Sequence, residues 1–347
     1  MSNTVQRIAV IGAGYFSQFH LHGWQHATNA QVVALCDADL TKAKTLAQQY
    51  GIEKIFNSAT QMLDSVELDL VDIVVPPVSQ NDLIRSCIDR KTAMICQKPF
   101  ASNLAQATEL TKLAQLNNVP LIIHENFRFM PWYREAHRLI HNGTLGALHG
   151  ISFRLRPGDG QGPNAYLDRQ PYFQTMPRLL VAETAIHFID TFRYLAGEIT
   201  AVYARLRKIN PVIKGEDAGL IIFEFASGAH GLFDGNRLND HSADNPRRTM
   251  GEMWIEGSSG VLRLDGDANL WFKPHHQTEA LHAYDNGHAN TFGNGACGAL
   301  QQAAISAIAQ NTEPENSAAA YLRNLKVQEA IYTSNSRGER IEIDLLS

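Results

Sequence analysis

Residues 7–17 read RIAVIGAGYFS, and this stretch decides the fold of the first part of the chain. Residues 7–11 form an apolar run of strand length, and a helix-like segment begins at Tyr15. Between them, Gly12 permits a tight turn and Gly14 lets the backbone approach a neighbouring group closely, because neither carries a side chain. The stretch therefore predicts a strand, a glycine turn and a helix in direct succession.

The same alternation of strand and helix continues to about residue 125. Further apolar runs rich in Val, Ile and Leu occur at 31–36, 70–75, 92–96 and 120–124. Helix-like segments separate them at 15–27, 40–50, 80–90 and 104–117. This pattern predicts a parallel sheet covered by helices on both faces, which is the doubly wound arrangement of α/β proteins.

After residue 126 the rhythm changes. We expect helices at 131–141, within 179–197, at 299–310 and at 318–334. Strand-like runs joined by short turns occur at 148–156, 201–208, 219–226, 229–235, 253–256, 260–264, 270–272 and 340–345. Such runs predict a mostly antiparallel sheet. The chain is therefore expected to form two domains, 1–125 and an α+β domain over 126–347.

Bulk composition narrows the functional classes. The chain of 347 residues is 44% hydrophobic and 19% charged, which is typical of a soluble globular protein with two domains. A net charge of −5 gives no basic excess for a nucleic acid. Apolar runs are too short for a signal peptide or a membrane span. Four scattered cysteines indicate reduced thiols in the cytoplasm. The expected partners are small molecules and other protein chains.

The glycine turn has a specific chemical interpretation at this position. The N-terminus of the helix that follows it offers N–H donors and a partial positive charge to a pyrophosphate. Ser17 occupies the third glycine position and is still small. Asp37 ends the second strand, where a carboxylate accepts hydrogen bonds from ribose hydroxyls and repels a 2′-phosphate. The sequence thus predicts a dinucleotide site that prefers NAD to NADP; the alternative is a capping aspartate beside an empty turn.

Lys98 follows the expected strand at 92–96, in the segment Cys96-Gln97-Lys98-Pro99-Phe100. Ligands of open α/β sheets bind at the carboxyl ends of the strands. Proline disfavours helical geometry at the residue before it, so we expect the lysine to project from an extended turn. There it can polarise a substrate oxygen or exchange a proton. A solvated loop lysine is the alternative.

A second candidate lies in LLVAETAIHFIDTFRYLAG, residues 179–197. On a helix, Glu183, His187, Asp190 and Tyr194 form one polar stripe. The stripe either faces water or faces a pocket in which the histidine moves protons. Oxidation of an alcohol by NAD requires a hydroxyl proton to leave as the hydride transfers. A lysine beside the cofactor and a histidine supported by a carboxylate would meet that requirement.

These segments together resemble the glucose–fructose oxidoreductase/inositol dehydrogenase (Gfo/Idh/MocA) family. The resemblance is carried, in order along the chain, by GAG at 12–14, Asp37, Pro76-Pro77, QKP at 97–99, NFRF at 126–129, ETAIHFID at 183–190 and WIEGSSG at 254–260. It implies a Rossmann domain followed by an α/β domain with an open, mainly antiparallel sheet. It also implies oxidation or reduction at a hydroxyl or keto carbon of a sugar, sugar acid or cyclitol.

The resemblance also implies residue roles. Catalysis is expected of Lys98, His187 and Glu183. Cofactor binding is expected of Gly12, Ala13, Gly14, Tyr15, Phe16, Asp37, Pro76, Pro77, Gln97 and Lys98. Arg128 and Thr184 match positions that contact substrate in the family; Tyr166, on a loop rich in glycine and aromatic residues, and Arg178 are further substrate candidates. The exposed sheet face of the family predicts a homodimer or homotetramer.

Two departures from the family pattern matter. Gln97 stands where the family has glutamate before Lys-Pro, and Glu183 stands where it has aspartate. Two other functions stay open: a dinucleotide-binding sensor without turnover, and a glycoside-processing enzyme in which NAD has a transient redox role. His137 and His141 have the spacing of paired zinc ligands, yet no third ligand is evident, so we expect no metal. Arg247-Arg248, in the polar insert 236–249, is a further candidate for binding an anionic group.

Overall fold

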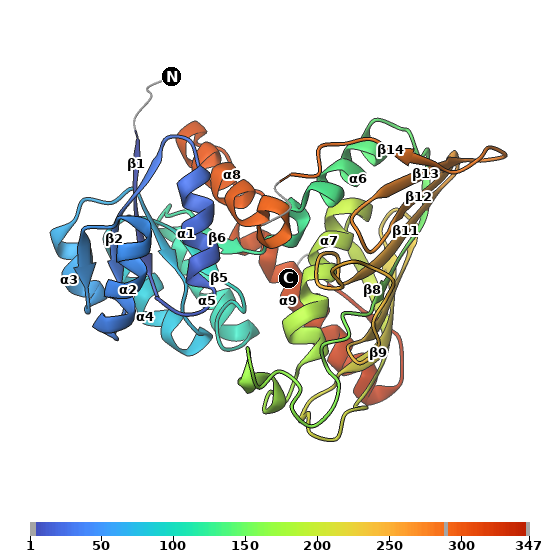
Figure 1. Cartoon of the computed structure of the whole chain (residues 1–347), viewed down its shortest axis with the longest axis horizontal. Coiled ribbons are helices and arrows are strands. Elements are labelled where there is room, and N and C mark those ends of the chain that lie inside the picture. The colour runs from blue at the N-terminus through green and yellow to red at the C-terminus, as the bar shows by residue number, and fades with distance from the viewer. Residues whose placement is uncertain (1–4, 288–290, 345–347) are drawn as a thin grey trace. The chain divides into compact units, whose positions relative to one another are not determined.

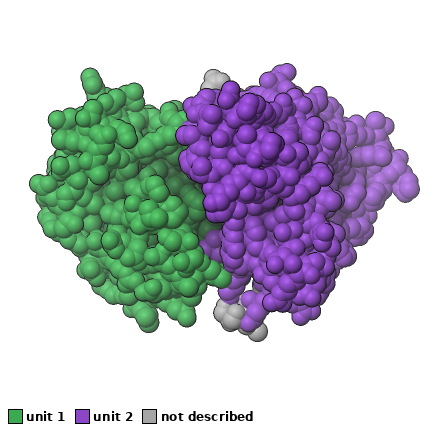
Figure 2. All heavy atoms as spheres, turned by 90° about the horizontal axis from the view of Figure 1, so that it is seen from below, with its two compact units in different colours: residues 1–129, 295–322 green, residues 130–294, 323–347 purple. Residues whose placement is uncertain are grey.

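The computed structural model describes residues 5–287 and 291–344. The chain forms two compact units, which Figure 2 colours separately. The first contains Met1–Phe129 and Gly295–Leu322, and the second contains Met130–Asn294 and Arg323–Ser347. The predicted division at 125/126 lies near the first crossing point. The prediction places Gly295–Leu322 in the second domain, whereas this segment belongs to the first unit. The sequence does not indicate this, because the segment is remote along the chain from the strands beside which it packs.

The first unit is built on a six-stranded parallel sheet of order β3-β2-β1-β4-β5-β6. Its strands are β1 (Gln6–Ile11), β2 (Ala30–Cys36), β3 (Lys54–Phe56), β4 (Leu70–Ile73), β5 (Ala93–Gln97) and β6 (Leu121–His124). Strands β4 and β6 are buried along their whole length, as expected for a sheet covered on both faces. The predicted doubly wound α/β fold is confirmed.

Five helices connect these strands, and a sixth is added from late in the chain. They are α1 (Ser17–His26), α2 (Leu40–Tyr50), α3 (Ala59–Ser65), α4 (Gln80–Asp89), α5 (Leu104–Leu116) and α8 (Ala296–Gln310). Helix α8 packs beside α1 (Figure 1). The two helices approach closely at a glycine pair: a Cβ on Gly23 would lie 2.9 Å from the main-chain nitrogen of Gly298. Larger residues there would force the helices apart.

The second unit is built on a nine-stranded sheet of order β14-β13-β12-β11-β7-β10-β9-β8-β15. Its strands are β7 (Leu148–Leu155), β8 (Ile199–Arg207), β9 (Ala218–Phe225), β10 (His230–Asn236), β11 (Gly251–Gly257), β12 (Gly260–Leu264), β13 (Leu270–Pro274), β14 (Ala280–His282) and β15 (Ile341–Glu342). Neighbours are antiparallel except β7 and β10, which are parallel. The predicted mainly antiparallel sheet is confirmed.

Helices cover one face of this sheet: α6 (Pro131–His141), α7 (Ile186–Ala196) and α9 (Ala318–Arg337), whose residues from 323 belong to the second unit (Figure 1). The core between α7 and the sheet is aromatic. The rings of Phe153 and Phe188 stack with centroids 3.9 Å apart, and the ring centroids of Phe188 and Phe233 are 5.4 Å apart. The strands alternate buried and exposed residues, so their other face carries side chains that the unit itself does not cover.

Several short elements depart from expectation. Strands β3 and β14 and helix α3 were not predicted, because three to seven residues are too few to show a period. The last strand spans only Ile341–Glu342, and residue 345 of the predicted strand 340–345 lies outside the described residues. Within the described ranges, no helix is both long and apolar enough to cross a membrane.

Candidate cofactor and substrate sites

The glycine turn after β1 has the geometry that a bound pyrophosphate requires. Gly12 has φ +112°, and a Cβ there would lie 2.2 Å from the carbonyl oxygen of Val74. Only glycine therefore fits between β1 and the end of β4. At Gly14 the situation is opposite, because an added Cβ would meet no atom within 4 Å. The backbone at Gly14 thus borders open space.

The N-terminus of α1, directly after this turn, has the features of an anion-binding site. No side chain caps it, and its first turn contains no acidic residue. The first N–H groups of a helix lack partners within the helix, so an anion there gains both hydrogen bonds and a favourable dipole. Ser17, in the third glycine position, is fully buried. Tyr15 is half-exposed, and Phe16 packs against Phe19.

Asp37 is fixed beside this turn. Its Oδ2 accepts a hydrogen bond from the Ala13 N–H at 2.6 Å, and its Oδ1 accepts one from the Asp39 N–H at 2.7 Å. Each carboxylate oxygen retains a further lone pair, so the group can still accept from ribose hydroxyls. With the open space at Gly14 and the uncapped helix, these contacts fit a dinucleotide with an unphosphorylated ribose.

The remaining predicted cofactor residues follow the carboxyl ends of β4 and β5. Pro76 and Pro77 lie in the turn after β4, where Pro77 begins a short 3-10 helix, Pro77–Ser79. Gln97 is the last residue of β5, and Lys98 follows it in a turn with a cis peptide to Pro99. Lys98 is partly exposed. In the first unit, the predicted cofactor residues therefore lie on one edge of the parallel sheet.

A buried polar cluster lies behind Gln97. His20 of α1 and Asp72 of β4 are fully buried, and His20 Nδ1 lies 2.8 Å from Asp72 Oδ2. The Trp24 indole donates to the same oxygen at 2.7 Å. On its other side, His20 Nε2 lies 3.3 Å from the side-chain oxygen of Gln97. His124 of β6 stacks on His20 with centroids 3.8 Å apart, and burial, together with the proximity of His20, holds the pKa of His124 well below its usual range.

Arg128 lies in the short 3-10 helix Phe127–Phe129 that follows β6, and it is mostly buried. It belongs to the first unit, with the lysine turn, while the other predicted substrate residues belong to the second. Its contact with substrate stays a prediction.

In the second unit, the segment with the predicted histidine is not one continuous α-helix. Residues Leu180–Ala185 form a π-helix that carries Glu183 and Thr184, and α7 begins at Ile186. His187 is therefore in the first turn of α7, where it is 6% exposed. Single π-helical turns occur frequently at functional sites. Sequence periodicity could not have shown the change of pitch, because apolar spacing over six residues fits either helix.

The C-terminal half of the predicted stripe has structural partners. Asp190 accepts a hydrogen bond from the Asn324 amide of α9 at 2.7 Å. Tyr194 stacks on His137 with centroids 4.0 Å apart, and its hydroxyl accepts from Arg134 at 2.7 Å. Asp190 and Tyr194 thus help to dock α7 against α9 and α6.

Thr184 is connected to the loop 158–175 by a residue that sequence reasoning missed, Arg237. This arginine is 2% exposed at the end of β10 and donates to the Thr184 hydroxyl. It also donates to the Tyr166 hydroxyl at 2.8 Å and to Asp159 at 2.9 Å. No signal in the sequence distinguishes Arg237 from Arg247 and Arg248, the other arginines of the insert 236–249.

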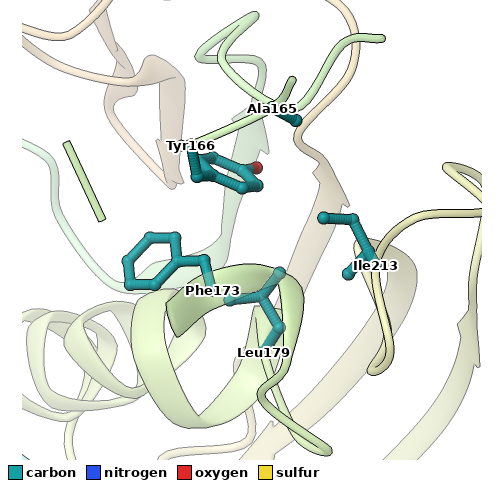
Figure 3. Packing of buried hydrophobic residues seen from close by; sticks show 5 residues of the cluster. All are labelled: Ala165, Tyr166, Phe173, Leu179 and Ile213. Carbon is teal, nitrogen blue, oxygen red and sulfur yellow. The ribbon is translucent and has the colours of Figure 1, made fainter. Parts of the chain in front are cut away.

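The two further substrate candidates, Tyr166 and Arg178, have different surroundings: Tyr166 lies in a buried apolar cluster, and Arg178 lies in a more exposed ion pair. The Tyr166 ring packs in an apolar cluster with Ala165, Phe173, Leu179 and Ile213 (Figure 3). Burial raises the pKa of Tyr166 to about 12, so its hydroxyl is a hydrogen-bond donor at neutral pH. Arg178 pairs with Glu329 at 2.7 Å and stacks over the Tyr332 ring at 4.1 Å. A role for either residue in substrate binding stays a prediction.

His137 and His141, the pair with zinc-ligand spacing, stack with centroids 3.8 Å apart. Among the residues that the structure describes, no three His, Cys, Asp or Glu side chains are grouped so that they could hold a metal ion.

Comparison with known proteins defines the class. Residues 6–125 match the family described as "Oxidoreductase family, NAD-binding Rossmann fold", and residues 133–263 match the "GFO/IDH/MocA C-terminal domain". The chain is 31% identical to the D-apiose dehydrogenase of Paraburkholderia graminis, over 99% of this chain and 92% of that protein. It is 26% identical to the D-apiose dehydrogenase of Rhizobium rhizogenes, over 99% of both. The chain therefore belongs to the Gfo/Idh/MocA family of NAD-binding oxidoreductases.

A solved structure agrees with this assignment. An oxidoreductase from Agrobacterium radiobacter, determined in complex with NAD+, L-tartaric acid and magnesium, superposes with a TM-score of 0.89 at 25% identity and 98% coverage of both chains. Levoglucosan dehydrogenase, in complex with NADH and levoglucosan, has the same fold, with a TM-score of 0.81 at 18% identity, covering 97% of this chain and 99% of that one.

Proposed function

We propose that this protein is an NAD-dependent dehydrogenase that interconverts a hydroxyl and a keto group on a sugar, sugar acid or cyclitol. The observation that carries the proposal is that Asp37 is held beside the glycine turn, directly before a helix whose N-terminus no side chain caps. The chain that contains this arrangement belongs to an NAD-binding oxidoreductase family. D-apiose is the first substrate to test, because two relatives matched along nearly the whole chain are named for it.

Gly12, Ala13 and Gly14 would hold the pyrophosphate, and Asp37 the adenosine ribose. When bound, NAD supplies the acceptor for a hydride from the alcohol carbon. The chain itself must remove the hydroxyl proton. We assign this step to His187, with Lys98 orienting the same oxygen, and Glu183 holding His187 or a neighbouring substrate hydroxyl. That Lys98 and His187 meet at one oxygen is part of the proposal.

The test is steady-state kinetics on a panel that contains D-apiose, other sugars, aldonic acids and inositols, followed as NADH formation. His187→Ala and Lys98→Met should each lower kcat by roughly 10²-fold or more, while NADH binding is retained. Lys112→Met and His276→Ala are matched controls, because both wild-type side chains are exposed and remote from the predicted site residues in sequence. Near-normal turnover in His187→Ala or Lys98→Met would refute the role of that residue. NADH binding without turnover on every compound would instead favour a sensor.

We also propose that the protein forms a homo-oligomer through the uncovered face of the nine-stranded sheet. Paired residues form one row across eight strands on this face, and most of them are apolar: Tyr203, Ile222, Leu232, Ser152, Trp254, Arg263, Trp271 and Leu281. Ile222 is 45% exposed and Leu232 is 40% exposed. A mostly apolar, partly exposed row of this kind favours burial against a partner.

Light scattering coupled to size exclusion tests the assembly. Ile222→Arg should convert a dimer or tetramer to smaller species, whereas Leu116→Arg, on the exposed surface of α5, should not. A monomeric parent protein would overturn this proposal. A cytoplasmic location is also proposed, and it is supported by the four cysteines, all of which are buried free thiols.

A further inference from the structure

Gln80 is an unusual residue for its position, because a glutamine side chain is fully buried beside the lysine turn. It begins α4, directly after the short 3-10 helix Pro77–Ser79. Burial of an amide is costly unless its donors and its acceptor are hydrogen-bonded. The partners of this amide therefore indicate why it is present.

The Gln80 amide bonds the main chain on both sides of Lys98. Its Nε2 donates to the carbonyl oxygen of Gln97 at 2.9 Å and to that of Pro99 at 3.0 Å. Its Oε1 accepts from the Ala101 N–H at 2.8 Å. The residues before and after Lys98 are thus held by one side chain, and the turn cannot rotate without breaking these bonds.

The same amide also reaches the turn after β4. Its Nε2 donates to the carbonyl oxygen of Val75 at 3.2 Å, and Pro76-Pro77 follow directly. Gln80 therefore joins two segments that follow adjacent strands, the turn with the predicted cofactor residues and the turn with the predicted catalytic lysine. The two N–H groups of one amide serve three carbonyl oxygens, so one of the contacts is shared.

We propose that Gln80 is a positioning residue that fixes Lys98 relative to the cofactor turn at Pro76-Pro77. This inference rests on the proposed function, since it gives Lys98 its role in the reaction. Misplacement of a catalytic group by about 1 Å costs up to roughly 10²-fold in rate. Loss of the amide should consequently lower kcat more than it changes the KM for the sugar.

Two substitutions test the amide. Gln80→Met keeps the length of the side chain and removes every hydrogen bond, and Gln80→Asn keeps the amide but shortens it by one methylene. We expect kcat to fall by about 10-fold or more in Gln80→Met and by less in Gln80→Asn. Thr111→Val is the matched control, because Thr111 is also a buried polar residue of the first unit and its hydroxyl donates within its own helix, to the Ala107 carbonyl oxygen. It should leave kcat unchanged.

A double-mutant cycle separates positioning from a general loss of structure. If Gln80 acts through Lys98, adding Gln80→Met to Lys98→Met should cause no further loss of kcat. An additive loss would overturn the proposal, and so would full turnover in Gln80→Met. If Lys98→Met alone retains near-normal turnover, the lysine role in the proposed function has failed, which is a separate result.

A second measurement does not depend on turnover. It uses Gln80→Asn, so the inference stays testable if Gln80→Met folds poorly. Reductive methylation with ¹³C-formaldehyde gives Lys98 an NMR signal, assigned by its absence in Lys98→Met. The signal should shift or broaden in Gln80→Asn and stay in place in Thr111→Val. An unchanged Lys98 signal in a folded Gln80→Asn variant would contradict the inference.

Discussion

The carboxylate of Asp37 and the main-chain N–H of Ala13 are joined by a hydrogen bond of 2.6 Å. The acidic residue that follows β2 and the glycine turn that follows β1 therefore have a fixed mutual geometry before any ligand binds. A carboxylate held by this hydrogen bond cannot easily rotate away to make room for a 2′-phosphate on the ribose. The proposed selection of NAD over NADP by Asp37 would thus depend on a contact within the first unit.

Asp37→Ala should lower kcat/KM for NAD by about 10-fold or more, because the ribose loses an anionic hydrogen-bond acceptor. The ratio of kcat/KM for NAD to that for NADP should fall as well, since the repulsion of the 2′-phosphate disappears. Initial rates with both cofactors at saturating sugar measure the ratio. An unchanged ratio would show that another residue selects the cofactor.

The two glycines of the turn should respond differently to the same substitution. Gly12→Ala places a Cβ against the Val74 carbonyl at positive φ, so it should destabilise the first unit by more than about 2 kcal/mol. Gly14→Ala meets open space and should leave stability nearly unchanged while it weakens NADH binding. Urea denaturation and NADH fluorescence titration separate the two effects. Equal stability losses would contradict this geometry.

Arg237→Met should destabilise the second unit by about 1–3 kcal/mol, because the partly buried Asp159 loses one of its two cationic partners and keeps only Arg169. The Tyr166 and Thr184 hydroxyls lose a donor at the same time. Thermal unfolding measures the loss. Arg263→Met is a suitable comparison, because the pair of Arg263 with Glu279 is more exposed and should contribute at most about 1 kcal/mol.

His124 should make the first unit sensitive to mild acid. Its folded-state pKa lies well below the 6.5 of an unfolded histidine, so the unfolded state binds more protons between these values. Stability from this residue is present above pH 6.5 and is lost as the pH falls toward the folded-state value. The free energy of unfolding should therefore be lower at pH 5 than at pH 7.

Denaturation of His124→Phe at both pH values checks this prediction. The variant should show a smaller loss of stability in acid than the parent, because phenylalanine keeps the stacking ring on His20 and cannot take up a proton. An identical pH dependence in parent and variant would assign the acid sensitivity to other groups.

The sequence was sufficient to predict two kinds of element. The first kind has a pattern of apolar residues long enough to show its period, and the second depends on residues with a specific conformational role, such as glycine in a tight turn. Five of the six parallel strands (all but β3), the glycine turn and α6, which spans Pro131–His141 as predicted, belong to these two kinds. Gln80 and Arg237 could not be found in this way. Both are polar residues in polar surroundings along the chain, and only the packing of remote segments makes them buried. The π-helix at Leu180–Ala185 was missed because its pitch depends on local packing and not on composition.

The return of α8 to the first unit has a practical consequence for anyone who wants to exchange cofactor modules between enzymes. Gln301 of α8 donates to the main-chain oxygen of His20 at 3.0 Å, and Gly298 packs against Gly23. A fragment cut at residue 129 would lose these partners and expose one side of α1. A transplantable module must therefore be assembled from two pieces of chain, 1–129 and 295–322, joined by a designed linker.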